Sequence, residues 1–145
     1  MFAKLFDQTI EINFDEQGIV GMSFVDNIDA SIDLNSDIQK QLTEYEKGSR
    51  KVFDLPLHLK GTEFQLKVWN ALLEIPYGET RSYQQIAQRI GQPKALRAVG
   101  GACNRNPIGI IVPCHRVIGK NGKLTGYAGG LFYKELLLNH EKRWD

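Results

Sequence analysis

Two capping boxes set the starts of two short helices, and no other local feature constrains the fold of this chain as strongly. In each box a hydroxyl residue is followed three positions later by glutamine: Thr62 by Gln65, and Ser82 by Gln85. The hydroxyl accepts a hydrogen bond from the glutamine's backbone N–H, and the glutamine side chain bonds back to the first residue. Apolar residues at helical spacing follow each box, and Gly91 ends the second segment. This part of the chain is therefore predicted to be mainly helical.

A third helix is predicted to begin at Pro93, whose fixed φ suits a first helical turn. Only Gly91 and Gln92 separate it from the helix before, a spacing typical of helix-turn-helix motifs. The second helix of the pair would present Lys94 and Arg97. An ordinary helical hairpin has the same spacing and remains an alternative.

The N-terminal part has the pattern of a small α+β unit. Residues 9–14 alternate polar and apolar side chains, and an apolar-rich segment follows at 19–25 after a turn sequence, which predicts a β-hairpin. Ser36 can cap a helix that stops at Gly48, and a short strand is expected over 55–59.

The distribution of charged residues also divides the chain near residue 60, where the α+β pattern gives way to the mainly helical one. Residues 1–60 hold 6 Lys and Arg against 11 Asp and Glu, whereas residues 61–145 hold 12 against 6. The formal net charge of +1 conceals this division. We therefore expect two domains, 1–60 and 61–145. Such asymmetry points to an anionic partner such as nucleic acid, with an unevenly charged solvated surface as the alternative.

Composition excludes several classes of protein. Hydrophobic residues make up 42% of the 145 residues and charged residues 24%, enough to form a core, so a disordered chain is excluded. Two cysteines cannot build a disulfide scaffold, the apolar runs are too short to cross a bilayer, and the N-terminus lacks a signal-peptide pattern. We expect a cytoplasmic protein with free thiols and no membrane association.

Cys114 and His115 stand together after the apolar run 108–112. A thiolate is the reactive form of cysteine, and a neighbouring imidazole can lower the pKa of the thiol. A carboxylate behind the imidazole would fix its tautomer, and Glu141 on the last predicted helix is a candidate. Adjacent cysteine and histidine also occur as structural core residues, so the pair alone leaves both interpretations open.

A zinc site is not expected. Ten residues separate Cys103 from Cys114, and His58 and His140 lack ligand spacing. Cys103 is expected to be a packed apolar residue.

Further motifs surround the Cys-His pair. They are Tyr77-Gly78-Glu79, Ser82 to Ala87, Arg97 to Ala102, Asn106-Pro107, Pro113 to Val117, Tyr127 to Leu131, Lys134-Glu135 and His140-Glu141. In this order and at this spacing they resemble the O6-alkylguanine–DNA alkyltransferases, also called methylated-DNA–protein-cysteine methyltransferases. The resemblance implies an α+β fold: a small RNase H-like α/β domain followed by a mostly helical, winged helix-turn-helix-like domain.

The resemblance implies direct DNA repair in a single turnover. Cys114 would take the alkyl group from O6-alkylguanine, with O4-alkylthymine as a further candidate substrate, and no cofactor or metal would be needed. His115 corresponds to a base that acts through a water, and Glu141 to the residue that orients it. Asn106 would brace the site, and Tyr83 would turn the target nucleotide and protonate guanine N3.

The resemblance also implies a pocket for the alkylated base. The carbonyls of Val117 and Cys114 would accept from its exocyclic amine, and Tyr127 would contribute to the pocket. Ala128 stands where many relatives have serine, and Gly109 where some have proline. We hypothesise that Gly109 leaves room for alkyl groups bulkier than methyl.

Double-stranded DNA is the partner that the resemblance implies, bound by a monomer through the minor groove. Arg97 corresponds to the family's arginine finger, which fills the space left by the flipped base. Ala98 and Gly100 would permit close approach, and Lys94 and Arg105 would contact phosphates.

The sequence leaves the role of Arg116 and several competing functions open. Arg116 is either a further phosphate contact or a structural residue. The competing functions are a non-catalytic lesion binder, against which Cys114 argues, a Cys-His hydrolase that turns over, and a helix-turn-helix regulator with a cysteine sensor.

Overall fold

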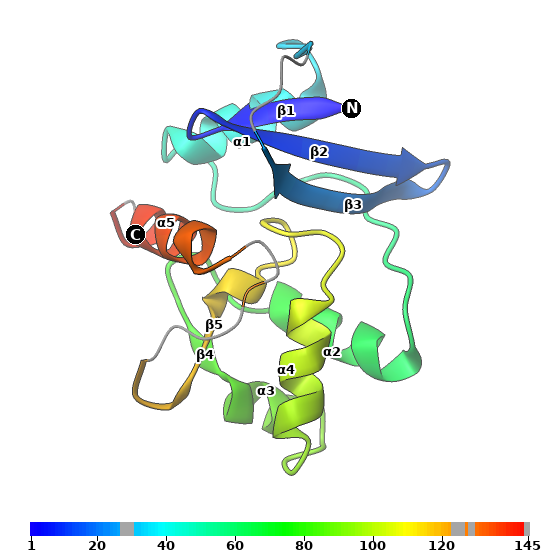
Figure 1. The fold of residues 1–145 in the computed structure, drawn as a ribbon, viewed down its shortest axis with the longest axis vertical. Coiled ribbons are helices and arrows are strands. Elements are labelled where there is room, and N and C mark those ends of the chain that lie inside the picture. The colour runs from blue at the N-terminus through cyan, green and yellow to red at the C-terminus, as the bar shows by residue number, and fades with distance from the viewer. Residues whose placement is uncertain (27–30, 123–126, 128–129, 144–145) are drawn as a thin grey trace. The chain divides into compact units, whose positions relative to one another are not determined.

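The computed structural model describes residues 1–26, 31–122, 127 and 130–143. The chain forms two compact units, Met1–Leu59 and Lys60–Asp145 (Figure 1). Within the described residues they hold a three-stranded antiparallel sheet, a two-stranded parallel sheet and five α-helices. The predicted α+β class is therefore confirmed. None of the described helices has the length and apolar character needed to cross a membrane.

The first unit is built on an antiparallel sheet. Its strands are β1 (Phe2–Leu5), β2 (Gln8–Asp15) and β3 (Gly18–Val25), in spatial order β1-β2-β3. The predicted hairpin is β2–β3, and its alternating pattern buries Ile10 and Ile12 on one face. Strand β1 was not predicted, because four residues are too few to show an alternation.

Helix α1 (Asp37–Glu46) packs beside β1 and has the predicted caps. The Ser36 side chain accepts from the backbone N–H of Gln39, and Gly48 adopts φ +83° just after the helix. The strand expected over 55–59 was wrong. Only a single bridge forms there, with Ile19, because Pro56 has no N–H with which to extend the pairing.

The second unit contains three short helices that pack on one another: α2 (Glu63–Leu73), α3 (Tyr83–Arg89) and α4 (Leu96–Asn104). Both capping boxes are present as predicted, at the starts of α2 and α3. The buried Trp69 indole N–H donates to the Ala102 carbonyl at 2.8 Å and ties α2 to the end of α4.

The connection between α3 and α4 is longer than predicted. Gly91 ends α3 with φ +78°, and the N–H of Gln92 bonds to the Ala87 carbonyl, as expected for a glycine stop. Pro93 does not start the next helix. Residues 93 and 94 form a turn closed by the Ala95 N–H on the Gln92 carbonyl, so α4 begins at Leu96.

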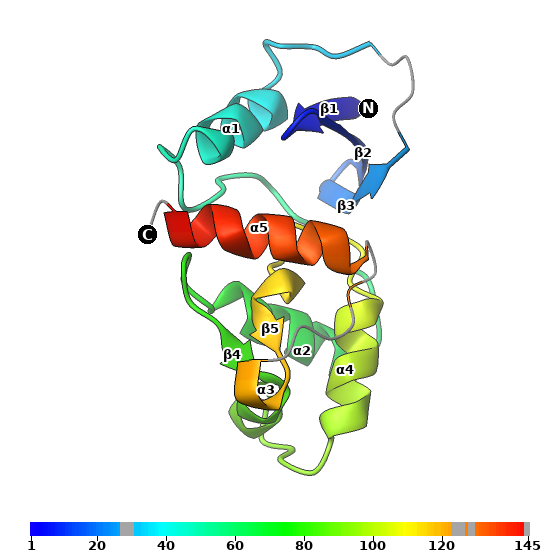
Figure 2. The same cartoon turned by 60° about the vertical axis from the view of Figure 1, so that its left-hand side comes forward.

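Apart from β4, the remaining elements of the second unit follow α4 in the chain (Figure 2). A 3₁₀ turn, η1 (Cys114–Arg116), leads into β5 (Val117–Ile118), which pairs in parallel with β4 (Arg81–Ser82). A second 3₁₀ turn, η2 (Lys120–Gly122), precedes α5 (Leu131–Arg143). The β4–β5 pair was not predicted, and it aligns the residues after Cys114 with those just before α3.

Candidate active site

A tight turn and an asparagine side chain fix the position of the Cys114 thiol. The turn is centred on Pro113 (φ −84°, ψ 62°) and closed by the Cys114 N–H on the Val112 carbonyl at 2.8 Å, which is inverse γ-turn geometry. Asn106 Nδ2 lies 2.8 Å from the Val112 carbonyl and 3.1 Å from Cys114 Sγ. The structure thus brings Asn106 and the buried thiol together.

The loop before Cys114 contains strained backbone. Ile110 has φ +74°, which a β-branched residue rarely adopts, and its side chain is buried. The Ile111 N–H bonds to the Gly109 carbonyl at 2.9 Å across it. Such a conformation costs about 1–3 kcal/mol and persists only where the surrounding packing holds it. Gly109, expected in the substrate pocket, therefore lies in a tightly turned loop.

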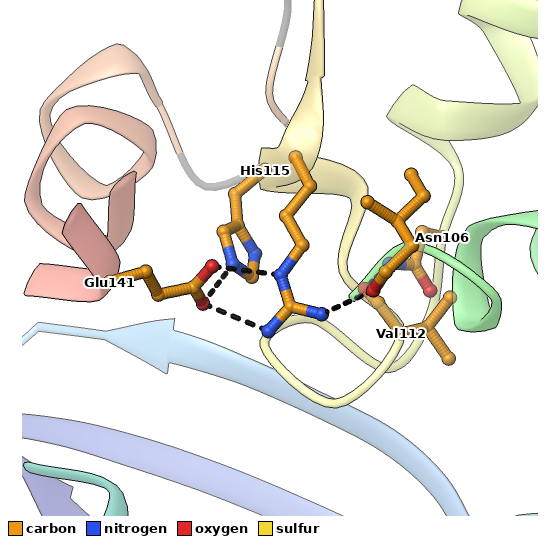
Figure 3. A network of polar contacts seen from close by, with 6 residues as sticks. Asn106, Val112, His115 and Glu141 are labelled. Carbon is orange, nitrogen blue, oxygen red and sulfur yellow. Dashed lines mark hydrogen bonds and ion pairs between the residues drawn. The ribbon is translucent and has the colours of Figure 1, made fainter. Parts of the chain in front are cut away.

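His115 and Glu141 face each other (Figure 3). His115 Nε2 lies 2.7 Å from Glu141 Oε2, and both side chains are buried. Burial by itself would raise the pKa of Glu141, but the contacts with His115 and Arg116 outweigh it and hold that pKa well below its ordinary value. Burial lowers the pKa of His115 against the opposing influence of Glu141. The resting pair is therefore an ionised carboxylate and a neutral imidazole.

The tautomer of His115 follows from this pairing. An ionised carboxylate can only accept hydrogen bonds, so the Nε2 that faces Glu141 carries the proton. Nδ1 then holds the lone pair, and this buried atom has no hydrogen-bond partner among the described residues. A basic nitrogen is thus present on the residue next to the thiol.

Arg116 is the third member of this buried cluster. Its Nε donates to Glu141 Oε1 at 2.8 Å, its Nη2 to Glu141 Oε2 at 3.1 Å, and its Nη1 to the Ile75 carbonyl at 2.8 Å. The guanidinium carbon lies 5.7 Å from the centre of the Tyr77 ring. Because Arg116 is only 7% exposed, it cannot reach a phosphate, and of the two interpretations left open by the sequence the structural one holds.

The thiol of Cys114 is protonated at neutral pH. Burial raises its pKa to about 11, although Asn106 and Lys134 act in the opposite direction. A neighbouring imidazole can lower the pKa of a thiol, but His115 is neutral and burial disfavours the thiolate, so this effect does not operate at Cys114. Burial also raises the pKa of Cys103, to about 12, as befits a packed residue. Cys114 therefore needs a base to become a nucleophile.

Lys134 is a site residue to which the sequence assigned no role. It is fully buried on α5, its Nζ donates to the Val117 carbonyl at 2.5 Å, and it lies 5.9 Å from the centre of the Tyr83 ring. Its spacing to Leu138 and Glu141 puts a lysine on the buried stripe of a helix, a signal that was available in the sequence. A carbonyl oxygen has two lone pairs, so the bond from Lys134 occupies only one acceptor position of Val117.

Tyr127 and Ala128 were expected to line the pocket for the alkylated base. Burial raises the pKa of Tyr127, and the negative charges that Cys114 and Glu141 can carry raise it further, which places Tyr127 close to both. Ala128 lies outside the described residues. Among the residues that the structure describes, no three His, Cys, Asp or Glu side chains are grouped so as to hold a metal ion.

The residues expected to contact DNA lie apart from this cluster, on α4 and its ends. Val99, Ala102 and Cys103 face the core, whereas the opposite face is exposed or half-buried. That face and its flanks carry Lys94, Arg97, Ala98, Gly100 and Arg105. A methyl group added at Gly100 or Gly101 would meet no atom within 4 Å, so packing within the protein requires neither glycine. Helix α4 leads through Arg105 directly to Asn106, which connects this face to the thiol.

The chain is similar in sequence to a known protein family and to known methyltransferases. Residues 63–143 match the family described as 6-O-methylguanine DNA methyltransferase, DNA binding domain. A methylated-DNA–protein-cysteine methyltransferase of Methanosarcina acetivorans is 68% identical over 102 residues, which are 70% of this chain and 65% of that protein. The match thus spans slightly less than two thirds of the relative's length.

Two solved structures from Mycobacterium tuberculosis are similar over most of the chain. An O6-methylguanine methyltransferase is 42% identical with a TM-score of 0.86, covering 99% of this chain and 93% of the other. A structure of the protein called OGT in complex with DNA is 44% identical with a TM-score of 0.82, covering 94% and 88%.

Proposed function

Because the chain belongs to the 6-O-methylguanine DNA methyltransferase family, we propose that it repairs DNA by moving an alkyl group from O6 of guanine to the sulfur of Cys114. The observation that carries this proposal is the buried set of contacts from Asn106 to the thiol and from His115 to Glu141. The protein would act as a cytoplasmic monomer without a cofactor, and O4-alkylthymine is a further candidate substrate.

The proposed transfer is a single displacement at the alkyl carbon. The sulfur of Cys114 forms the new S–C bond as the C–O6 bond breaks, and the thiol proton passes through a water to Nδ1 of His115. The electron pair of the broken bond goes to guanine, which takes a proton at N3 from Tyr83. That proton makes guanine a neutral leaving group, and transfer of the proton from His115 to Tyr83 restores both side chains to their neutral forms. Water does not cleave the thioether product, so the protein is consumed.

The environment of the thiol supports this use of a base. Since burial holds the pKa of Cys114 at about 11, unassisted ionisation at neutral pH is rare. His115 is neutral and buried, with the Nδ1 lone pair unengaged among the described residues. Glu141 would stabilise the imidazolium that forms during transfer.

The pocket would hold the base between Tyr83 and the Val117 carbonyl. Tyr83 begins α3 immediately after β4, and the β4–β5 pairing keeps it near Val117 and the carbonyl expected to accept from the exocyclic amine. Lys134 contacts both residues, because its Nζ bonds to that carbonyl and lies over the Tyr83 ring. We infer that Lys134 holds these two substrate contacts at a fixed separation.

Duplex DNA is the proposed partner, in keeping with the DNA complex of the similar mycobacterial protein. A buried thiol cannot reach O6 within a stacked duplex, so the damaged nucleotide must be flipped out, which costs a few kcal/mol. Arg97 would fill the space that the base leaves. The exposed glycines of α4 would allow its backbone to approach the minor groove closely.

Mass spectrometry tests the transfer itself. Incubation with duplex DNA containing O6-methylguanine should replace one hydrogen per chain with one methyl group, located on Cys114. Cys114→Ala should abolish transfer and retain DNA binding, whereas Cys103→Ala should transfer normally. Methyl on Cys103, or turnover beyond one equivalent as a hydrolase would show, would refute the mechanism.

The role of Arg97 needs a separate comparison. Arg97→Ala should slow repair of duplex DNA far more than transfer from the free base O6-benzylguanine, because only the duplex requires a flipped nucleotide. Arg50→Ala removes one positive charge from the first unit and should change neither rate. Equal slowing of both reactions in Arg97→Ala would mean that Arg97 supports the fold instead.

A further inference from the structure

Glu141 is shared by two neighbouring residues of η1. Oε1 of its carboxylate accepts from Arg116 Nε, and Oε2 accepts from Arg116 Nη2 and His115 Nε2. The two bonds from Arg116 are parallel, which is the side-on arrangement that holds guanidinium and carboxylate in one plane. The third guanidinium nitrogen, Nη1, is held by the Ile75 carbonyl at the end of α2. Arg116 therefore fixes both the position and the plane of the carboxylate that His115 faces.

Arg116 provides the positive charge that balances the buried carboxylate of Glu141. A buried carboxylate needs a counter-charge, and here Arg116 provides it while the imidazole stays neutral. Without Arg116 the nearest group able to compensate Glu141 would be His115, by taking a proton. An imidazolium cannot accept the proton of Cys114, so the base would be blocked before the reaction began.

We propose that Arg116 is a positioning residue for the alkyl transfer: it compensates and aims Glu141, and thereby keeps His115 neutral with Nδ1 free to accept the thiol proton. This inference rests on the proposed function of Cys114 as the acceptor. Arg116 does not touch the substrate in this scheme and acts only through Glu141 and His115.

Among the described residues, few other titratable or charged groups lie near His115 and Glu141. Within η1 they are Arg116 and Cys114, and on α5 Lys134 adds a positive charge that disfavours imidazolium. Tyr127 is near Glu141 and stays protonated, because burial raises its pKa. Lys134 remains when Arg116 is replaced, but its Nζ bonds to the Val117 carbonyl, and an ammonium lacks the two parallel donors with which a guanidinium holds the plane of a carboxylate.

The first test uses the unmodified protein and no substrate. The ¹⁵N chemical shifts of His115 should report a neutral ring protonated at Nε2 around pH 7. An imidazolium, or a ring protonated at Nδ1, would overturn the proposal. Because this measurement involves no alkyl group, it stays informative if transfer to Cys114 is not observed, an outcome that would refute the proposed function alone.

The second test is the pH dependence of transfer from O6-benzylguanine, which avoids effects on DNA binding. The unmodified protein should keep its rate as the pH falls through about 6.5, the ordinary histidine pKa. In Arg116→Met the His115 pKa should rise, and the rate should fall about tenfold per pH unit below that raised pKa. A folded Arg116→Met variant with the unmodified pH profile would overturn the proposal.

A matched control and a conservative variant complete the experiment. Arg89 makes the same side-on pair with Glu74, at 2.9 and 3.0 Å, but on the surface, so Arg89→Met should leave the profile unchanged. If Arg116→Met does not fold, Arg116→Lys replaces it. Lysine keeps the charge and loses the two parallel donors. We expect transfer several-fold slower at every pH with His115 still neutral, and an unmodified rate in this folded variant would contradict the proposal.

Discussion

Replacing Gly101 by alanine is expected to stabilise the protein and to weaken its binding to DNA. Gly101 lies inside α4 with an ordinary helical backbone, and an added methyl group would meet no protein atom within 4 Å. Alanine is favoured over glycine in a helix interior by about 0.8–1.0 kcal/mol, so the free energy of unfolding should rise by about that amount. A protein that keeps this glycine at such a cost must gain something outside its own packing.

The gain that we expect is contact with DNA. If the α4 backbone lies against the minor groove, a methyl group at Gly101 holds the surfaces apart and lowers the affinity for duplex DNA. Urea denaturation measures the first effect, and fluorescence anisotropy with a duplex measures the second. Transfer from free O6-benzylguanine should not change, because the added methyl group would meet no protein atom within 4 Å and so would leave Asn106 and Cys114 in place.

The control for this substitution is Gly91→Ala. Gly91 also has open space around it, but its φ of +78° disfavours alanine. That variant should therefore be destabilised by about 1 kcal/mol and should keep its DNA affinity. If Gly101→Ala binds DNA as tightly as the unmodified protein, α4 does not approach DNA closely, and the proposed interface is wrong.

Three further predictions concern stability and reactivity. Trp69→Phe removes the donor to the buried Ala102 carbonyl and should lower the free energy of unfolding by about 1–3 kcal/mol, as measured in urea. The pKa of His115 is lowered in the folded protein, so the unfolded chain takes up this proton first, and stability should fall as the pH drops below about 6.5; His115→Gln should lessen that slope. Iodoacetamide should modify Cys114 slowly at neutral pH and faster as the pH rises towards the raised pKa of about 11, whereas a rate already maximal at neutral pH would contradict the buried thiol described above.

The parts of the fold that were predicted correctly depend on residues close together in the sequence. Thr62 and Ser82 cap their helices through partners three residues away, and Gly91 stops α3 within one turn. The β2–β3 hairpin likewise forms across a two-residue connection. Each of these structures needs only a local hydrogen bond and a suitable φ, so the residue types suffice to predict it.

The incorrect predictions fall where a local preference was not decisive. Pro93 suits a first helical turn, yet the chain forms a separate turn there and starts α4 at Leu96. The segment 55–59 has strand composition, but it meets only Ile19 and forms a single bridge. In both cases the outcome depends on which partner the folded chain places nearby.

In the candidate site, too, some features could be predicted from the sequence and others depend on the tertiary structure. The sequence alone determined which residues are proposed to carry the chemistry, because the Cys114–His115 pair, Asn106, Tyr83 and Glu141 belong to motifs whose order and spacing resemble one family. It could not determine the protonation state of the thiol, the contacts of Lys134 or the contacts of Arg116. Those depend on contacts between residues far apart in the chain: Arg116 with Glu141 across 25 positions and with Ile75 across 41. Only the tertiary structure buries these groups and sets which of them bears a charge, since both effects arise from elements that meet after folding.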